Sequence, residues 1–109
     1  MRIWDIEPEK LCRQHLLGEH RELHATWSIL TKDKQGYREH PEVKRWEGKL
    51  KALYNRHEIL VEEMLKRGYH HKSPLDTKLA VGYGLQDEYV DTIPQQIKIL
   101  REKSCDCRV

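Results

Sequence analysis

The stretch that decides the fold runs from residue 41 to residue 68 and reads PEVKRWEGKLKALYNRHEILVEEMLKRG. Apolar residues recur in it at alternating steps of three and four, which places them on one face of an α-helix. A proline stands at its start and a glycine at its end, as is usual for helix termini. We therefore predict one helix from Pro41 to about Arg67, of about 26 residues and roughly 39 Å, as the longest element of the chain.

Two further helices are predicted on either side of this stretch. Pro8 followed by an acidic residue marks the start of one helix, whose apolar stripe continues to about Thr31. Thr92 precedes a shorter helix that ends near Lys103. Residues 69–93 show no sustained period and contain two glycines and a proline, so we expect mostly loop there. The prediction is an all-α protein of three helices with long ordered loops.

Length and composition indicate one small domain spanning residues 1–109. The chain has a formal net charge of +2, and 35% of its residues are charged. It contains no run of 18 apolar residues, so we expect no membrane association, and its start lacks the apolar stretch of a signal peptide. We therefore expect a cytoplasmic protein, which we take to be a monomer.

Three cysteines are present, which is an odd number and does not suit a closed set of disulfides. Cys105 and Cys107 form a Cys-x-Cys pair near the end of the sequence, but one pair lacks the four ligands of a structural zinc site. We expect Cys12, Cys105 and Cys107 to be free thiols, with no metal and no cofactor. His57 lies on the apolar stripe of its helix and is interpreted as a buried, hydrogen-bonded histidine rather than a ligand or base.

Positive charge gathers in the middle of the chain. Residues 32–72 carry a net charge of +4 and hold four of the seven histidines, whereas the segments on either side are each slightly acidic. A polyanion would therefore bind most readily to this third of the sequence. The candidates for contact with phosphate groups there are Lys44, Arg45 and Lys72.

The first helix carries an unusual second face besides its apolar stripe. Ionisable or polar side chains alternate there with the smallest residues, Gly18 and Ala25. Glycine inside a helix destabilises it by about 1 kcal/mol relative to alanine, so it indicates a close approach at that position. Either a ligand approaches between charged side chains, or another helix crosses an ordinary solvated surface. The other members of this face are Gln14, His15, Arg21 and Glu22.

Residues 14–23, which read QHLLGEHREL, resemble the pyrimidine-dimer DNA glycosylase family of the phage endonuclease V type. The distance of this motif from residue 1 matches the family without a gap, and residues 65–69, LKRGY, resemble the end of the family's second helix. The resemblance implies an enzyme that cleaves the glycosidic bond at ultraviolet-induced dimers in double-stranded DNA. It also implies AP-lyase activity, in which the strand is then nicked by β-elimination without a metal or a nucleotide cofactor.

The family's nucleophile is the amine at the mature N-terminus, which implies that role for Met1. Initiator methionine is normally removed only when residue 2 is small. Because Arg2 is large, we expect Met1 to stay in place. The resemblance gives Glu22 the roles of stabilising positive charge at the sugar C1′ and of helping to remove the C2′ proton. We therefore expect Met1 to lie close to Glu22, with the N-terminal segment folded back over Gly18 and Ala25.

The resemblance also indicates which residues contact DNA. Arg2 and Arg21 would hold phosphates beside the lesion, and Gln14 and His15 would orient the strand. Ala25 departs from the family pattern, which has an arginine there, and the chain lacks an aromatic, basic C-terminal tail. Both departures leave open an enzyme that acts on another lesion or on abasic sites alone. A non-catalytic helical module that binds nucleic acid through the basic middle third is the other alternative.

Overall fold

The computed structural model describes residues 2–71 and 73–109, so Met1 and Lys72 lie outside the part described here. This part contains four α-helices and two short 3-10 helices, and no strand beyond one antiparallel bridge between Lys49 and Gly82. The all-α prediction is confirmed, whereas the predicted number of three helices is wrong. In chain order the elements are η1 (Pro8–Lys10), α1 (Arg13–Thr31), α2 (Pro41–Lys44), α3 (Leu50–Lys66), η2 (Thr77–Leu79) and α4 (Ile93–Glu102).

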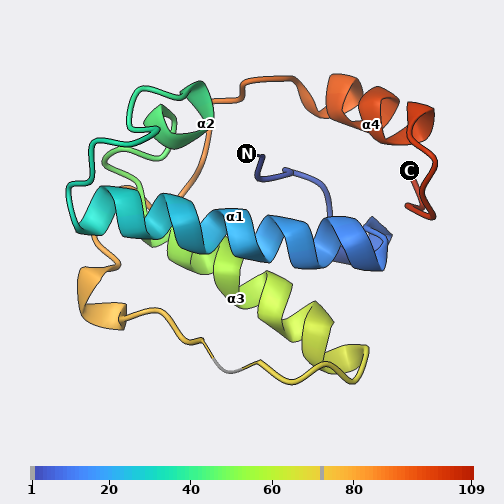
Figure 1. Cartoon of the computed structure of the whole chain (residues 1–109), viewed down its shortest axis with the longest axis horizontal. Coiled ribbons are helices and arrows are strands. Elements are labelled where there is room, and N and C mark those ends of the chain that lie inside the picture. Colours follow the sequence, from blue (N-terminus) through green and yellow to red (C-terminus); the bar gives the residue numbers. More distant parts are fainter. Residues whose placement is uncertain (1, 72) are drawn as a thin grey trace.

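Helices α1 and α3 pack against each other (Figure 1) and supply half of the buried hydrophobic residues of the core. The predicted apolar stripes face inward: Leu16 and Leu23 of α1 and Leu53 and Leu60 of α3 are each 0% exposed. Burying a leucine side chain contributes about 1.5–3 kcal/mol, so these contacts are a main source of stability. Helix α1 is thereby fixed with its opposite face turned away from the core.

The predicted single helix over residues 41–67 is wrong, because the chain breaks between α2 and α3. Gly48 adopts a φ of 74°, a left-handed conformation that interrupts a helix. Residues 82–83, in the connection after α3, contact the chain at this point: the Tyr83 backbone N–H donates to the Gly48 carbonyl oxygen at 2.8 Å. A Cβ atom on Gly82, whose φ is 88°, would overlap that carbonyl group. The break thus depends on a backbone contact with a distant segment, and α1 rather than α3 is the longest helix.

The first helix also begins later than predicted. Pro8 starts the short 3-10 helix η1, and α1 begins at Arg13 with Cys12 at its N-cap. Leu11 stands between them in an extended conformation and is 2% exposed. Burial of this leucine in the core therefore separates the two helices.

Residues 2–7 form an extended segment that lies between α1 and α4 (Figure 1). Ile3, Trp4 and Ile6 are buried in the core. Gln96 of α4 fixes the segment, because its side chain accepts from the Asp5 backbone N–H at 2.8 Å and donates to the Asp5 carboxylate at 3.0 Å. The segment before α1 is thus held along that helix by α4.

The short C-terminal helix matches its prediction. Thr92 caps α4, and Gln95 completes a reciprocal capping box with it. The long connection between α3 and α4 contains η2 and wraps the helices, held in part by Lys49, whose ammonium group contacts Asp87 and Glu88 at 2.9 and 2.8 Å. None of the helices in the described residues combines the length and apolar character needed to cross a membrane.

Candidate active site on the exposed face of helix α1

Helix α1 presents a row of polar residues on the side turned away from α3. Gln14, Gly18 and Glu22 follow one another at four-residue steps and therefore share a face. They border a hollow of about 280 Å³ that also receives residues from the N-terminal segment and from α4. The lining residues are Arg2, Trp4, Gln14, His15, Gly18, Glu19, Glu22, Ile99 and Lys103.

A second hollow, of about 730 Å³, continues along α1 toward the loop that follows it. Glu22 lines both hollows, so the two are neighbours on this side of α1. The two together form a depression along one side of α1 that suits an extended ligand. The second hollow is lined by Glu22, His24, Ala25, Ser28, Ile29, Lys34, Gly36 and Tyr37.

Two carboxylates on α1, one turn apart, have different environments. Glu19 is buried and forms a two-point ion pair with Arg56, with oxygen–nitrogen distances of 2.7 and 3.0 Å. Burial raises the pKa of Glu19, and the Arg56 charge opposes that shift. Glu22 is half-buried and makes no hydrogen bond or ion pair with any other residue in the described part of the chain. Glu19 is therefore the structural carboxylate, and Glu22 is the one available to a ligand.

The space above Gly18 is open rather than occupied by a crossing helix. A Cβ atom at this position would meet only one described neighbour within 4 Å, the Arg21 guanidinium at 4.0 Å. Because Gly18 has no side chain, the space above the helix at this point stays part of the first hollow. Arg21 itself is exposed, as is Gln14, so both side chains can reach a ligand that enters the hollow.

The N-terminal segment forms one wall of the first hollow. The Arg2 guanidinium pairs with Asp91 at 2.8 Å and lies 4.9 Å from the ring centre of Trp4. Both Arg2 and Trp4 line the hollow with Glu22. The expectation that Met1 lies close to Glu22 concerns a residue outside the described range, as does the expected phosphate contact of Lys72.

His15 lies at the end of the hollow nearest the start of α1. Its Nδ1 atom is 3.1 Å from the Cys12 Sγ atom and 3.3 Å from the Cys107 Sγ atom. The ring packs edge-on against Trp4, with the ring centres 5.8 Å apart. Burial and the nearby charge of Lys103 lower the pKa of His15. The imidazole is consequently neutral at pH 7, and its position is fixed on several sides.

The structure corrects the expectation that Arg45 binds phosphate. Its side chain is only 4% exposed and forms ion pairs with Glu42 at 2.7 Å and Asp5 at 3.0 Å. It also donates to the Ile3 carbonyl oxygen at 2.9 Å. Arg45 therefore joins α2 to the N-terminal segment and is not accessible to DNA. Lys44 differs, because its side chain is 52% exposed and pairs with Glu39 at the surface, at 2.8 Å.

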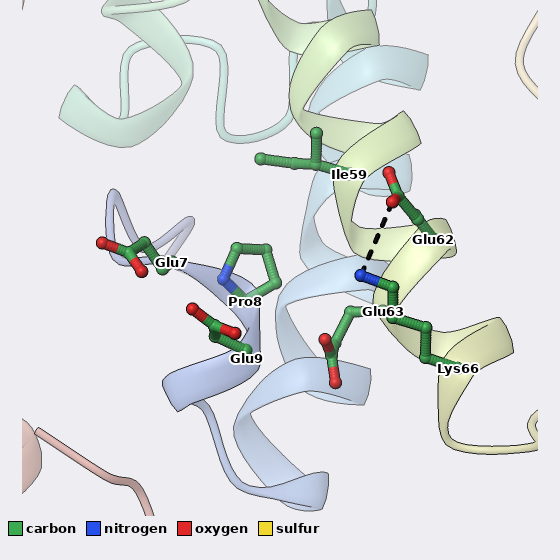
Figure 2. Close-up of a pocket in the computed structure, with 7 residues that line it drawn as sticks. All are labelled: Glu7, Pro8, Glu9, Ile59, Glu62, Glu63 and Lys66. Atoms are coloured by element: carbon green, nitrogen blue, oxygen red, sulfur yellow. Dashed lines mark ion pairs between the residues drawn. The ribbon is translucent and has the colours of Figure 1, made fainter.

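A further hollow, of about 300 Å³, lies between η1 and the end of α3 and is strongly acidic (Figure 2). Four glutamates line it, and its lysine, Lys66, is 3.6 Å from the Glu62 carboxylate. This concentration of negative charge repels a phosphate backbone. The acidic hollow is therefore not a DNA-binding site. Its lining residues are Glu7, Pro8, Glu9, Ile59, Glu62, Glu63 and Lys66.

Four histidines form a cluster between α1, α3 and the segment after α3: His20, His24, His57 and His71. His57 is 1% exposed, and its ring nitrogens contact His24 and Glu58, each at 3.1 Å, so it is buried and hydrogen-bonded as predicted. Burial and the other three imidazoles lower the pKa of His20 to about 4. Burial also lowers the pKa values of His24 and His57, so these three imidazoles are neutral at pH 7.

Sequence reasoning missed three of the residues around the first hollow. Trp4 precedes the first helix, and Ile99 and Lys103 come from α4 or its end, far along the chain from Glu22. No local pattern links these positions, because only the packing of the N-terminal segment between α1 and α4 brings them together. The local sequence signal for the depression was the pair of small residues Gly18 and Ala25. These two residues line its floor, and they do not indicate which residues form its walls.

Comparison with known proteins identifies the family. The family model for pyrimidine dimer DNA glycosylase matches residues 1–77. This range includes α1, α2 and α3 and all residues that line the two hollows except Ile99 and Lys103. No curated protein and no solved structure matches the chain. The matched segment holds Arg2, Arg21 and Glu22, the residues that the sequence motif singled out. The chain belongs to the pyrimidine dimer DNA glycosylase family.

Proposed function

We propose that this protein is a DNA glycosylase with AP-lyase activity that acts on ultraviolet-type pyrimidine dimers in double-stranded DNA. The observation that carries the proposal is the position of Glu22, which lines two neighbouring hollows and has no charged partner among the described residues. Membership of the glycosylase family supports the reaction class. The residues proposed to perform the chemistry are Met1 and Glu22.

In the proposed reaction the Met1 α-amine attacks C1′ of the damaged nucleotide. A bond forms between nitrogen and C1′, the glycosidic bond breaks, and the base leaves with the bonding electron pair and takes up a proton. An α-amine suits this step because its ordinary pKa of about 7.7–8.0 leaves a useful fraction unprotonated at pH 7, unlike a lysine amine. The Glu22 carboxylate stabilises the positive charge that develops at C1′.

Strand cleavage follows from the imine that forms between the amine and the opened sugar. The imine makes the C2′ proton acidic, and Glu22 accepts that proton. The electron pair then forms the C2′–C3′ double bond as the C3′–oxygen bond breaks and the phosphate leaves. Water finally hydrolyses the imine and restores the amine. No step needs a metal or an electron carrier.

The proposed DNA contacts lie around the same depression. Arg21 and Gln14 are exposed beside Glu22, and Arg2 lines the hollow from the N-terminal segment. We assign Arg2 and Arg21 to phosphates and Gln14 and His15 to orientation of the strand. Lys44 and Lys72 would add contacts farther along the duplex. Lys103 lines the hollow as well and joins this group.

Borohydride trapping tests the proposal, since only an enzyme that forms an imine becomes covalently linked to DNA on reduction. The full chain is incubated with duplexes that carry a thymine dimer, an abasic site or neither. Trapping on the first two and not on the third is expected. Trapping on abasic DNA alone would indicate a lyase that acts on abasic sites and not on dimers. The departure from the family pattern at Ala25, which lines the second hollow, favours that alternative. Absence of trapping on all three would leave a non-catalytic nucleic-acid-binding module.

A further inference from the structure

Four imidazoles, one buried and three partly exposed, converge from three separate segments. His20 and His24 are one turn apart on α1, His57 lies on α3, and His71 follows α3. One ring nitrogen from each lies within 4.8 Å of one nitrogen from every other. The Nε2 atoms of His24 and His57 are 3.1 Å apart. Tetrahedral zinc with zinc–nitrogen bonds of about 2.0–2.1 Å needs ligand nitrogens roughly 3.3 Å apart, so small rotations of these rings complete such a site.

Two of these imidazoles have buried nitrogens with no partner among the described residues. The Nε2 atoms of His20 and His71 are inaccessible to solvent and make no hydrogen bond with any described residue. A buried polar atom without a partner is unfavourable and uncommon in folded proteins. A cation shared by the cluster would satisfy both atoms at once.

The surroundings of the cluster are those of metal-binding histidines. The Nδ1 atom of His57 is 3.1 Å from the Glu58 carboxylate, which orients the ring and leaves Nε2 to face the cluster. A hydrogen bond with the backbone of Ser73 supports His24 in the same way. Such carboxylate and backbone partners are typical of histidines that bind zinc.

We propose that His20, His24, His57 and His71 bind one structural Zn²⁺ ion. Imidazole nitrogens are good ligands for this borderline metal, and four protein ligands fill its tetrahedral shell. With no open position the ion activates no water, so its role is to fasten α1, α3 and the segment after α3. His24 also lines the second hollow beside Glu22, so the ion would stiffen the floor of the proposed active site.

A different set of residues carries a second, independent proposal. Cys12 and His15 at the start of α1 meet Cys105 and Cys107 near the end of the sequence, with their ligand atoms within 4.8 Å of one another. The His15 Nδ1 atom lies 3.1 and 3.3 Å from the Cys12 and Cys107 sulfur atoms. The Cys12 backbone N–H points at the Cys107 sulfur, 3.1 Å away, as is favourable for a thiolate.

We infer that these three cysteines and His15 bind a second structural zinc ion. Three thiolates and one imidazole are an established closed zinc shell. The ion would attach the segment after α4 to the start of α1 and so hold the wall that carries Lys103. His15 also lines the first hollow, and binding through Nδ1 leaves its Nε2 atom without a metal, which is compatible with the proposed contact with the DNA strand.

Metal analysis of the full-length protein, purified without chelator in the presence of Zn²⁺ and then dialysed, tests both sites independently of DNA activity. About two zinc ions per chain are expected. His20→Gln and His71→Gln should each lower the content by about one ion, as should Cys105→Ser and Cys107→Ser. His70→Gln and Ser104→Ala, which change exposed neighbours, should retain both ions. Circular dichroism verifies that each variant is folded.

Cobalt substitution of the wild-type protein separates the two sites without relying on any variant. Co²⁺ should give the intense visible bands of tetrahedral coordination, and the sulfur site should add a near-ultraviolet thiolate charge-transfer band that disappears in Cys107→Ser. A wild-type protein that binds neither Zn²⁺ nor Co²⁺ overturns both proposals. Unchanged zinc content in both His20→Gln and His71→Gln overturns the first.

Thiol titration decides the second proposal against a disulfide. Zinc-bound cysteines should react slowly with a thiol reagent until a chelator is added, after which three thiols per chain should react. Only one reactive thiol after chelation would indicate a disulfide and overturn the second proposal. Three thiols that react at once without a chelator would overturn it as well.

Discussion

Arg56 holds Glu19 through two oxygen–nitrogen contacts of 2.7 and 3.0 Å, while the same guanidinium donates to the Ile6 carbonyl oxygen at 2.9 Å. This arrangement joins α3 to α1 and to the N-terminal segment. It commits Glu19 to the interior and leaves Glu22, one turn later, facing the hollows. A change of Glu22 is therefore expected to affect the reaction, whereas a change of the Arg56–Glu19 pair is expected to affect the stability of the fold.

Glu22→Gln should reduce strand nicking by about 10²–10⁴-fold, because the amide neither stabilises positive charge at C1′ nor accepts the C2′ proton. The thermal unfolding midpoint should stay at the wild-type value, since Glu22 has no partner among the described residues. Gel-based nicking of an abasic duplex and a melting curve provide the two measurements. Nicking at close to the wild-type rate would show that Glu22 is only a surface carboxylate.

Arg56→Ala should destabilise the fold by about 3–5 kcal/mol, because it leaves the buried Glu19 carboxylate without its partner. Urea unfolding measures the change in the free energy of unfolding. The double variant Arg56→Ala, Glu19→Gln should be more stable than Arg56→Ala alone, since no buried charge then remains. Lys66→Gln, which removes an exposed pair, is the control and should change little. If the single and double variants were destabilised equally, the unpaired charge of Glu19 would not be the main cause of the loss of stability.

DNA affinity should depend strongly on salt and be weak for undamaged duplex, given a net charge of only +2. Arg21→Gln should lower affinity and reduce the slope of log affinity against log salt concentration by about one. Fluorescence anisotropy over a series of salt concentrations gives both values. Lys66→Gln serves again as the control, because this lysine lies in the acidic hollow of Figure 2 and should leave the slope unchanged. Binding to undamaged DNA that is independent of salt would refute the electrostatic interpretation.

The reactive amine should belong to Met1. The intact mass should include Met1 without an acetyl group, and the peptide that borohydride links to DNA should be the N-terminal one. Lys103 is the competing amine, since it lines the same hollow as Glu22. Lys103→Arg retains the charge but removes that amine, and it should leave trapping intact. Loss of trapping in Lys103→Arg, with the adduct mapped to Lys103 in the wild type, would show that the nucleophile is the Lys103 amine.

Local sequence signals predicted the features that depend on neighbouring residues. The apolar stripes of α1 and α3, the capping box at Thr92 and the family motif around Glu22 all lie within short windows. Each is set by helix periodicity or by contacts within a turn, so one sequence suffices to find it.

The errors arose where distant segments meet. The helix break at Gly48 depends on the backbone of residues 82–83, and Arg45 is buried because Asp5 and Glu88 are brought to it. Residues 12–15 and 105–107 also lie together in space although most of the chain separates them, so the sequence did not show that Cys12 and His15 stand beside the Cys-x-Cys pair. Spacing along the sequence cannot reveal such groups, because their members are set by packing rather than by periodicity.

Helix α4 supplies Ile99 to the first hollow, and Lys103 follows directly after it, yet both residues lie beyond the matched residues 1–77. The wall that faces Glu22 therefore lies outside the part of the chain that the family model describes. In the proposed enzyme, substitutions in this C-terminal wall would change the shape of the damaged nucleotide that fits, while the proposed reacting groups stay unchanged. Lesion preference and chemistry would then depend on different parts of the chain.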